Sequence, residues 1–305
     1  MITENMAFID LHTHSSASDG TLAPPELVRL AKDRNLAAMA LTDHDTIDGL
    51  AQAVAAGLEL GLEVIPGVEI SAKYALGPGS MHILGFFLDY ENGLLAQRLV
   101  VLKQARKDRN PQIVAKLKDQ GIPITMERVE QISGGGQVGR PHIARALLES
   151  GQVRSIQEAF DIYLGNNGLA YVSKFRFPPE EAIAMIRDAK GIPVMAHPFT
   201  LGLHTAESLR PLLKDLAALG LAGVECYYPE HSPDQEALYL SLARELGLLI
   251  TGGSDFHGDN KPEVSLGRIN CQPRLTYDLV TAMKAWRGAK GQWGFTPTPN
   301  PLEGV

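Results

Sequence analysis

Short apolar runs alternate with amphipathic stretches along most of the chain. Seven runs have the length and apolar content of strands, and they span residues 8–14, 36–44, 62–71, 81–88, 192–199, 221–228 and 248–257. Apolar residues at helical spacing fall between most of them, at residues 24–35, 46–60, 178–190, 208–219 and 233–246. Nearly continuous apolar strands that alternate with helices predict an α/β fold with a parallel sheet covered by helices. Seven such strands favour a distorted (β/α)7 barrel over an open sheet.

The alternation stops in the middle of the chain, where the apolar spacing becomes helical throughout. Helices are predicted at residues 92–108, 111–120, 125–132, 140–150 and 155–164, with a glycine-rich loop at 134–139. We therefore divide the chain into a first barrel part (1–93), an inserted, mostly helical domain (94–176), a second barrel part (177–290) and an irregular tail (291–305).

The composition is that of a globular protein. With 305 residues, 45% hydrophobic and 21% charged, the chain is long enough for a barrel with an insertion. No apolar run reaches the ~18 to 20 residues that span a bilayer, and the amino terminus lacks the features of a secretion signal. Cys226 and Cys271 have neither metal-binding nor redox spacing. These observations predict a cytoplasmic protein with no membrane partner and no obligate protein partner.

The charge is unevenly distributed along the chain. The formal net charge of -7 argues against DNA or an anionic membrane as a partner. Residues 94–176, however, contain 13 Lys and Arg against 7 Asp and Glu, which gives the insertion a net charge of +6 and leaves -13 on the remainder. The net charge of the whole chain therefore conceals a basic insertion beside an acidic barrel.

Histidines and carboxylates gather at the ends of the predicted strands. His12 and His14 lie two residues apart, so both imidazoles project from one face of the first strand, and Asp255 and His257 repeat this spacing on the last strand. Five of six such clusters lie at the carboxyl ends of strands, where the active sites of barrels are assembled. The resulting candidate metal ligands are His12, His14, Asp19, His44, Glu69, His82, His197, Asp255 and His257.

Nine nitrogen and oxygen ligands exceed the three or four that a catalytic ion usually takes from a protein. The set fits two or three divalent ions, and its mixture of imidazoles and carboxylates suits Mn²⁺, Fe or Zn²⁺ better than Ca²⁺ or Mg²⁺ alone. Asp10 and Asp43 are expected either to orient imidazoles by accepting hydrogen bonds or to lie in the core. No GxSxG motif, Walker loop or dinucleotide fingerprint competes with these clusters. Hydrolysis by metal-activated water is therefore the predicted chemistry.

The order of the clusters resembles that of a known family. The motifs HTHS followed by Asp19, LTDHD, GVEIS, MHILG, AHP and GSDFH together resemble the PHP (polymerase and histidinol phosphatase) family of metal-dependent phosphoesterases. The insertion, with GRPHIARAL and YVSKF, is similar to the TrpH-like branch of that family. Members of this branch remove the 3′-phosphate from nucleoside 3′,5′-bisphosphates, and related activity on short RNA from the 5′ end occurs.

The resemblance implies a distorted seven-stranded barrel with a trinuclear metal site, commonly with manganese. Carried onto this sequence, it assigns the ligands to three ions, with Glu69 bridging the first two. The first ion would take His12, His14, Glu69 and Asp255, the second Glu69, His82 and His197, and the third Asp19, His44 and His257.

The basic insertion then acquires a role in substrate binding. Arg140 and Lys174, with His142 nearby, are hypothesised to bind a phosphate group. The alternatives are surface charges for Arg140 and Lys174 and a capping or packing role for His142. His197 or His257 is a candidate to protonate the leaving alkoxide, provided that it is not fully engaged as a ligand. His204 and His231 have no partner pattern, so they are expected to be solvated or at helix ends.

The predicted function is removal of the 3′-phosphate from a nucleoside 3′,5′-bisphosphate by a metal-bridging hydroxide, which gives a 5′-mononucleotide and phosphate. The alternatives within the class are a 5′-to-3′ exoribonuclease acting on short RNA and a phosphatase of the histidinol-phosphate type, which would not explain a cationic insertion. Two alternatives lie outside the class of phosphoesterases: a metal-dependent amidohydrolase and a non-catalytic metal-binding module that acts through a partner.

Overall fold

A computed structural model of the chain describes residues 7–75, 77, 79–91, 93–269 and 275–289. The predicted irregular tail (291–305) and Cys271 lie outside the described residues. The strands are β1 (Phe8–Asp10), β2 (Leu36–Leu41), β3 (Glu63–Ala72), β4 (Met81–Phe86), β5 (Ile192–Met195), β6 (Gly223–Tyr227) and β7 (Leu249–Gly252). The helices that accompany them are α1 (Pro24–Asp33), α2 (Leu50–Leu60), α7 (Pro179–Asp188), α8 (Ala206–Ala218), α9 (Pro233–Glu245) and α10 (Asp278–Ala289).

The seven strands form one sheet in sequence order, β1 to β7. The sheet is mixed, because β4 runs antiparallel to both β3 and β5 while the other neighbouring pairs are parallel. The prediction of a wholly parallel sheet was therefore wrong at β4. Residues 73–80 are too few for a parallel crossover, which needs about a dozen residues, so the chain turns straight back. As a result, β4 begins at the edge where the parallel strands end.

The sheet closes into a distorted barrel through the segments that follow β1 and β7. The backbone N–H of His14 donates to the carbonyl of Phe256 at 2.9 Å, and that of Asp255 donates to the carbonyl of His12 at 2.8 Å. A Cβ at Gly253 would lie 2.3 Å from the backbone nitrogen of His12, so this approach requires glycine. The α/β fold with a distorted seven-stranded barrel is therefore confirmed, and its closure brings the ends of β1 and β7 together.

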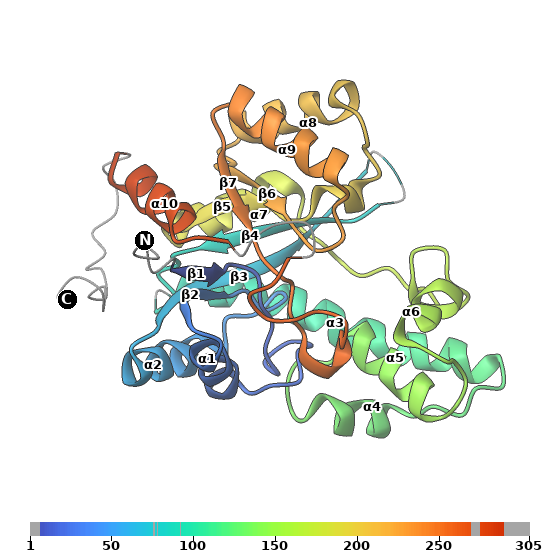
Figure 1. Ribbon diagram of the computed structural model, residues 1–305. Helices are drawn as coiled ribbons and strands as arrows, with labels where there is room; N and C mark the ends of the chain where they lie inside the picture. The colour runs from blue at the N-terminus through green and yellow to red at the C-terminus, as the bar shows by residue number, and fades with distance from the viewer. Residues whose placement is uncertain (1–6, 76, 78, 92, 270–274, 290–305) are drawn as a thin grey trace.

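Two apolar clusters hold the barrel. One joins strand residues such as Leu41 and Ile83 to the helices α1, α2, α7, α8 and α9, which cover the sheet (Figure 1). The other joins alternate strand residues, among them Ile65, to Val280 of α10, a helix that the sequence patterns did not predict. Figure 1 shows α10 on the side of the sheet away from the middle part of the chain. Within the described residues, no helix is both long and apolar enough to cross a membrane.

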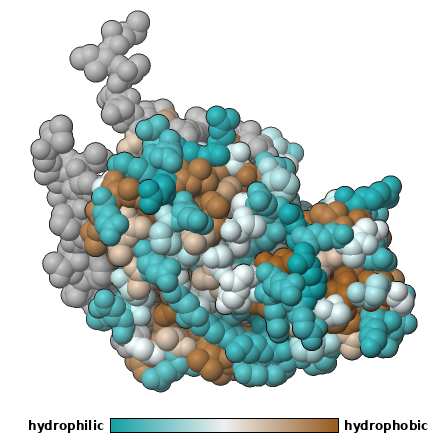
Figure 2. Space-filling model, turned by 90° about the horizontal axis from the view of Figure 1, so that it is seen from below, coloured by the Kyte–Doolittle hydropathy of each residue, from teal (hydrophilic) through white to brown (hydrophobic). Residues whose placement is uncertain are grey.

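The middle part of the chain is helical. It contains α3 (Gly93–Asp119), α4 (Met126–Ser133), α5 (Arg140–Glu149), α6 (Ile156–Ala159) and the π-helical segment η1 (Phe160–Leu164). These elements lie beside the barrel, and Figure 2 shows them as a lobe on which hydrophilic residues separate the apolar patches.

The helix α3 connects the lobe to the barrel. The sequence predicted two helices that separate at Pro111, whereas the structure has a single helix with Pro111 inside it. The loss of one backbone hydrogen bond at proline is offset here by packing on both sides of it. Leu99 belongs to the barrel cluster, and Ile113 and Leu117 belong to a separate cluster within the lobe.

Candidate metal centre

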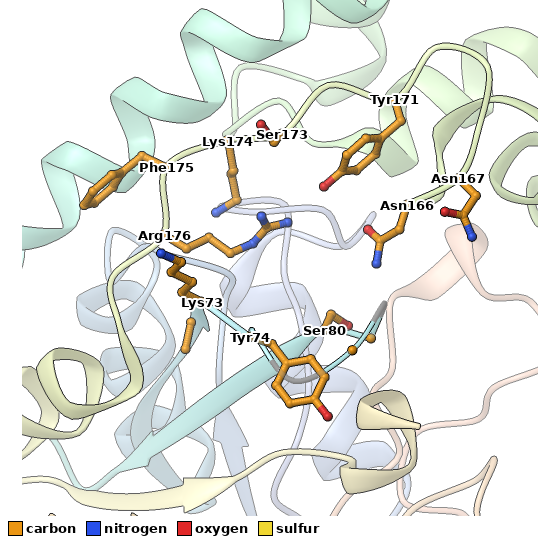
Figure 3. A pocket seen from close by; sticks show the side chains of 13 residues that line it. Lys73, Tyr74, Ser80, Asn166, Asn167, Tyr171, Ser173, Lys174, Phe175 and Arg176 are labelled. Atoms are coloured by element: carbon orange, nitrogen blue, oxygen red, sulfur yellow. The ribbon is translucent and has the colours of Figure 1, made fainter. Parts of the chain in front are cut away.

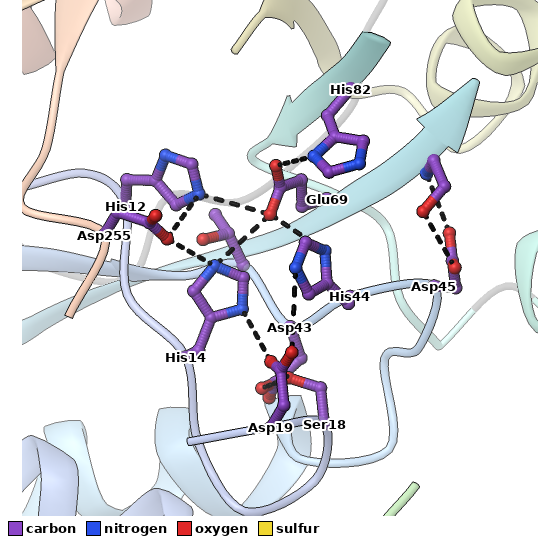
Figure 4. A network of polar contacts seen from close by, with 12 residues as sticks. His12, His14, Ser18, Asp19, Asp43, His44, Asp45, Glu69, His82 and Asp255 are labelled. Carbon is purple, nitrogen blue, oxygen red and sulfur yellow. Dashed lines mark hydrogen bonds and ion pairs between the residues drawn. The ribbon is translucent and has the colours of Figure 1, made fainter. Parts of the chain in front are cut away.

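Glu69 on β3 is the central carboxylate of the site (Figure 4). It is fully buried, and both of its oxygens face imidazoles. Oε1 lies 2.7 Å from Nδ1 of His82 and 2.9 Å from Nε2 of His197. Oε2 lies 3.3 Å from Nε2 of both His12 and His14 and 3.0 Å from Nδ1 of His44. One carboxylate thus joins five histidines that come from four different segments of the barrel edge.

The first group of ligand atoms combines Glu69 with the segments after β1 and β7. His12, His14, Glu69 and Asp255 each offer a nitrogen or oxygen atom within one compact set. Oδ1 of Asp255 lies 3.4 Å from Nε2 of His12 and 3.1 Å from Nε2 of His14. Both ring nitrogens of His14 are buried, yet neither forms a hydrogen bond with the described part of the chain. Buried nitrogens that approach carboxylates without hydrogen-bonding geometry fit a shared metal ion.

Two further groups share members with the first. His14, Asp19, His44 and His257 form one of them, in which Oδ1 of Asp19 lies 3.3 Å from Nε2 of His257. His44, Glu69 and His82 form the other, and His197 contacts the same carboxylate. The antiparallel direction of β4 explains why His82, at the start of a strand, joins side chains at the ends of others. The structure therefore places all nine predicted ligands in one connected cluster, whose donor set fits two or three transition-metal ions.

The carboxylates of the cluster are held ionised. Burial opposes the charge of Glu69, but the imidazoles of His44, His82 and His12 outweigh it and hold the pKa of Glu69 well below its usual value. Burial likewise opposes the charge of Asp19, and its pKa also lies well below the usual value because of His44 and His257. Buried and ionised oxygens surrounded by imidazoles are the environment that a cation needs.

Three residues that the sequence did not reveal orient the ligands. Oε1 of Glu225, on β6, lies 2.9 Å from Nδ1 of His12, and its Oε2 accepts the backbone N–H of His197 at 2.7 Å. The hydroxyl of Tyr228 donates to Oδ2 of Asp255 at 2.7 Å, and Lys261 forms an ion pair with the same oxygen. The signal for Glu225 was a lone carboxylate inside an apolar strand, a place where charge is costly unless it is paired.

Asp10 and Asp43 are both buried, but neither orients an imidazole within the described residues. Asp10 accepts the backbone N–H of His12, both donors of Ser254 and the backbone N–H of Gly267. Asp43 accepts the backbone N–H and hydroxyl of Ser15 and the hydroxyl of Ser18. The two carboxylates therefore fix the backbone around the ligands, and the predicted orienting role belongs to Glu225.

The backbone is strained at three positions around the cluster. Asp45, His197 and Asp255 have φ values of +54°, +22° and +55°, in a region that residues with a Cβ rarely adopt. All three lie just beyond the ends of strands. Strain of this kind persists where the surrounding contacts fix a side chain for function.

The remaining histidines differ in their surroundings. His257 directs Nδ1 to the carbonyl of Asp255 and Nε2 to Asp19, while His197 directs Nδ1 to Thr200 and Nε2 to Glu69. Both nitrogens of each ring thus have a partner. His204 is exposed just before the first residue of α8, as expected. His231 lies one residue before the N-cap of α9, which agrees with the helix-end alternative, but its ring is buried rather than solvated and contacts Tyr228 and Tyr239.

The lobe contributes a basic wall beside the cluster. Asp45, next to the candidate ligand His44, accepts hydrogen bonds from Arg106 of α3 and from Lys174. The Nζ atom of Lys174 lies 2.7 Å from Oδ2 of Asp45, and burial lowers the pKa of Lys174 to about 7 even though Asp45 opposes this shift. A Cβ at Gly139 would lie 3.7 Å from both Arg106 and Asp19. The basic wall, formed by Arg106 and Lys174, therefore lies next to the candidate metal cluster at Asp19.

Arg140 and His142 occupy the first turn of α5. Nη1 of Arg140 donates to the carbonyl of Leu164 at 2.8 Å, and its guanidinium lies over the ring of Phe160. His142 is buried and accepts the backbone N–H of Gly139 with Nδ1, so it caps the helix. Burial lowers the pKa of His142, which keeps the ring neutral at physiological pH.

A polar pocket of about 560 Å³ lies between the lobe and the β3–β4 connection (Figure 3). Lys73, Tyr74 and Ser80 line it on the barrel side. Asn166, Asn167, Tyr171, Lys174 and Arg176 line it from the segment that returns from the lobe. Lys174 connects the pocket to the cluster, because it lines the pocket and contacts Asp45, the residue after His44.

The sequence and the structure are similar to those of known proteins. The PHP domain family model matches residues 10–189. The chain is 38% identical over 248 residues to a 5′-3′ exoribonuclease of Haemophilus influenzae, covering 81% of this chain and 89% of the relative. It is 34% identical over 283 residues to a 3′,5′-nucleoside bisphosphate phosphatase of Chromobacterium violaceum, and the match covers 92% of this chain and 98% of the relative.

A solved structure agrees with the sequence comparisons. An amidohydrolase from Chromobacterium violaceum, with bound sulfate and no metal, superposes with a TM-score of 0.82 at 32% identity and covers 92% of this chain and 96% of that one. The family match includes the segments that carry His12, His14, His44, Glu69 and His82. The chain therefore belongs to the PHP domain family.

Proposed function

We propose that the protein is a metal-dependent phosphoesterase that removes the 3′-phosphate from nucleoside 3′,5′-bisphosphates and releases a 5′-mononucleotide and phosphate. The observation that carries this proposal is the pairing of two opposite environments. The central carboxylate Glu69 lies in one cluster with the eight other candidate ligands, and the basic wall with a nucleoside-sized pocket lies beside this cluster. A phosphate ester carries the charge that both environments require. The relative from Chromobacterium violaceum supports the choice of substrate.

The nine side chains from His12 to His257 are proposed as the ligands of two or three ions, with Mn²⁺ as the expected metal and Fe or Zn²⁺ also suited to the donor set. When bound, such ions lower the pKa of a coordinated water and neutralise charge on phosphoryl oxygens. Glu69 would contribute one oxygen to each of two ions, since Oε1 and Oε2 face different histidines. Glu225 and Tyr228 would keep His12 and Asp255 in the orientation that ligation requires.

Arg140, Lys174 and His142 are proposed to bind phosphate groups of the substrate. Lys174 lies on the pocket wall and is held by Asp45, so its ammonium is positioned rather than free to rotate. His142 uses Nδ1 as a helix cap, which leaves Nε2 to donate to a phosphoryl oxygen. Because both nitrogens of His197 and His257 have partners, neither ring offers a spare proton while it acts as a ligand.

A second candidate function is 5′-to-3′ exonuclease activity on short RNA. The relative from Haemophilus influenzae supports it. Both activities cleave a phosphate ester at the 3′-oxygen of a nucleotide, so the same metal cluster would serve either. They differ in whether a further nucleotide follows the reacting phosphate.

A phosphate-release and product assay tests the proposal. The Mn²⁺-supplemented protein is given a nucleoside 3′,5′-bisphosphate, a simple mononucleotide, histidinol phosphate and short 5′-phosphorylated RNA. The proposal predicts the highest kcat/KM for the bisphosphate, with strict dependence on added metal, and no activity in His12→Ala. Preferential release of mononucleotides from RNA would favour the exonuclease, whereas inactivity on all four substrates would exclude both candidates.

A further inference from the structure

Three arginines of the lobe have no carboxylate partner among the described residues. Arg109 of α3 is 3% exposed, and within the described part of the chain its side chain donates only to Oδ1 of Asn110, at 3.1 and 2.7 Å. Arg140 donates to a backbone carbonyl, and Arg176 forms neither a hydrogen bond nor an ion pair with the described part of the chain. A buried or half-buried cation without an anion is unfavourable, so each position requires an explanation. We call Arg109, Arg140 and Arg176 the arginine cluster.

The members of the cluster act on one another. Burial and the charges of Arg106, Arg140 and Arg176 hold the pKa of Arg109 well below its usual value. Burial and the neighbouring Arg176 lower the pKa of Arg140 to about 10. The amide of Asn110 donates to the carbonyl of Val138 at 2.9 Å, which holds α3 against the start of α5. The packing of α3 against α5 therefore holds the positive charges of the arginine cluster near one another in spite of their repulsion.

The cluster differs from the two cations that contact Asp45. Arg106 and Lys174 share the buried carboxylate of Asp45, which compensates part of their charge. Arg176, which has no such carboxylate partner among the described residues, lines the 560 Å³ pocket together with Lys174. The same pocket exposes the ring of Tyr171 and the side-chain amides of Asn166 and Asn167 (Figure 3). Aromatic rings and amides are groups that stack on and hydrogen-bond to a nucleoside.

We propose that Arg109, Arg140 and Arg176 form an anion subsite that binds the 5′-phosphate of the substrate, the phosphate that is not cleaved, while the nucleoside occupies the pocket beside the metal cluster. The inference rests on the proposed function. Guanidinium groups bind phosphate oxygens in a bidentate manner, and three of them match a dianionic monoester. Arg109 and Arg176 thereby become determinants of specificity, and Tyr171, Asn166 and Asn167 become contacts for the nucleoside.

The subsite predicts which substrates the protein selects. A nucleoside 3′-monophosphate carries the reacting phosphate but leaves the arginine cluster without an anion. Charge-assisted hydrogen bonds to a buried site typically change binding by about 10- to 100-fold. We therefore expect the wild-type protein to prefer the 3′,5′-bisphosphate over the 3′-monophosphate by at least this factor in kcat/KM.

The experiment measures kcat/KM for both compounds in the Mn²⁺-loaded wild type and in three variants. Arg176→Ala removes a cluster member that is only partly buried, Arg176→Lys retains the charge, and Arg154→Ala is the matched control on the same lobe. Arg154 is 93% exposed and pairs with Glu158, so its loss changes the net charge without affecting the pocket. Inhibition by the 5′-mononucleotide and by inorganic phosphate is measured in parallel.

The subsite predicts a loss of about 10- to 100-fold in kcat/KM for the bisphosphate in Arg176→Ala, a much smaller loss for the 3′-monophosphate, and partial recovery in Arg176→Lys. Inhibition by the 5′-mononucleotide should weaken by a similar factor, while inhibition by inorganic phosphate at the metal cluster should not. Equal losses for both substrates, or an effect no larger than that of Arg154→Ala, would overturn the subsite and leave the proposed function intact. If the wild type hydrolyses neither compound, the proposed function fails and the subsite fails with it.

Discussion

Buried charges have partners of opposite sign in the candidate metal cluster but not in the arginine cluster. Around Glu69, carboxylates and imidazoles alternate, so nearly every charged oxygen has a nitrogen within about 3 Å to 4 Å. Arg109, Arg140 and Arg176 influence one another's charge, and none of them forms an ion pair with a carboxylate among the described residues. The first region therefore has the donor set of a metal site, and the second has the charge of an anion-binding site. The proposed substrate, a phosphate ester with a second, non-reacting negative group, would match both regions.

The largest expected effect is a loss of catalytic activity on replacement of Glu69. Replacing it with glutamine, Glu69→Gln, removes the negative charge that five histidines share, and should lower kcat/KM by about 1,000-fold or more, because metal ions contribute several kcal/mol to catalysis. Glu63→Gln is the matched control on the same strand, since Glu63 pairs with Lys284 at the other end of β3. Similar activity in the two variants, measured with added Mn²⁺, would contradict the central role of Glu69.

The next largest effect is a loss of stability on replacement of Asp45, which follows His44 in the barrel and contacts two cations of the lobe. Asp45→Asn leaves the buried cations Arg106 and Lys174 without their carboxylate, and breaking such a pair typically costs about 3 to 5 kcal/mol. We expect a loss of stability of this size in chemical denaturation. Asp48→Asn removes an exposed partner of Lys103 and should cost under about 1 kcal/mol. Equal stability of the two variants would show that Asp45 does not hold the lobe to the barrel.

A smaller effect is expected at Glu225. Glu225→Gln keeps the size of the side chain but weakens the contact with Nδ1 of His12, and the loss of such an orienting carboxylate typically lowers metal affinity about 10- to 100-fold. Titration with Mn²⁺ measures this change. Glu245→Gln, which affects an exposed pair with Arg210, serves as the control. Unchanged affinity in Glu225→Gln would mean that His12 is oriented without it.

The smallest effect is expected at Pro111. Pro111→Ala restores a backbone donor within α3 and removes a ring that disturbs the preceding turn, so it should stabilise the protein slightly, by up to about 1 kcal/mol in thermal or chemical unfolding. A clear loss of stability would show that α3 requires the proline where the barrel and the lobe meet.

The two regions also differ in how much of them the sequence reveals. The candidate ligands were found because strand geometry is periodic: residues such as His12 and His14 must share a face, and strand ends must meet at one edge of a barrel. The arginine cluster has no such regularity. Arg109 and Arg176 are far apart in the sequence, and only the packing of α3 against α5 and the returning segment makes them neighbours of Arg140.

The same distinction applies to the fold. Local patterns predicted the seven strands and most of the helices, but not the direction of β4, which depends on the length of the connection before it. They also placed a break at Pro111, where tertiary packing keeps one helix. Glu225 was overlooked because its role is set by a partner, His12, that lies more than two hundred residues away in the sequence.

The most direct test of a metal cluster centred on Glu69 is the number of Mn²⁺ ions bound per chain, measured by equilibrium dialysis and elemental analysis for the wild type, Glu69→Gln and Glu63→Gln. We expect two or three ions in the wild type and in Glu63→Gln, and at most one in Glu69→Gln, because the two oxygens of Glu69 face two different sets of histidines. The same number of ions in all three proteins would contradict this expectation.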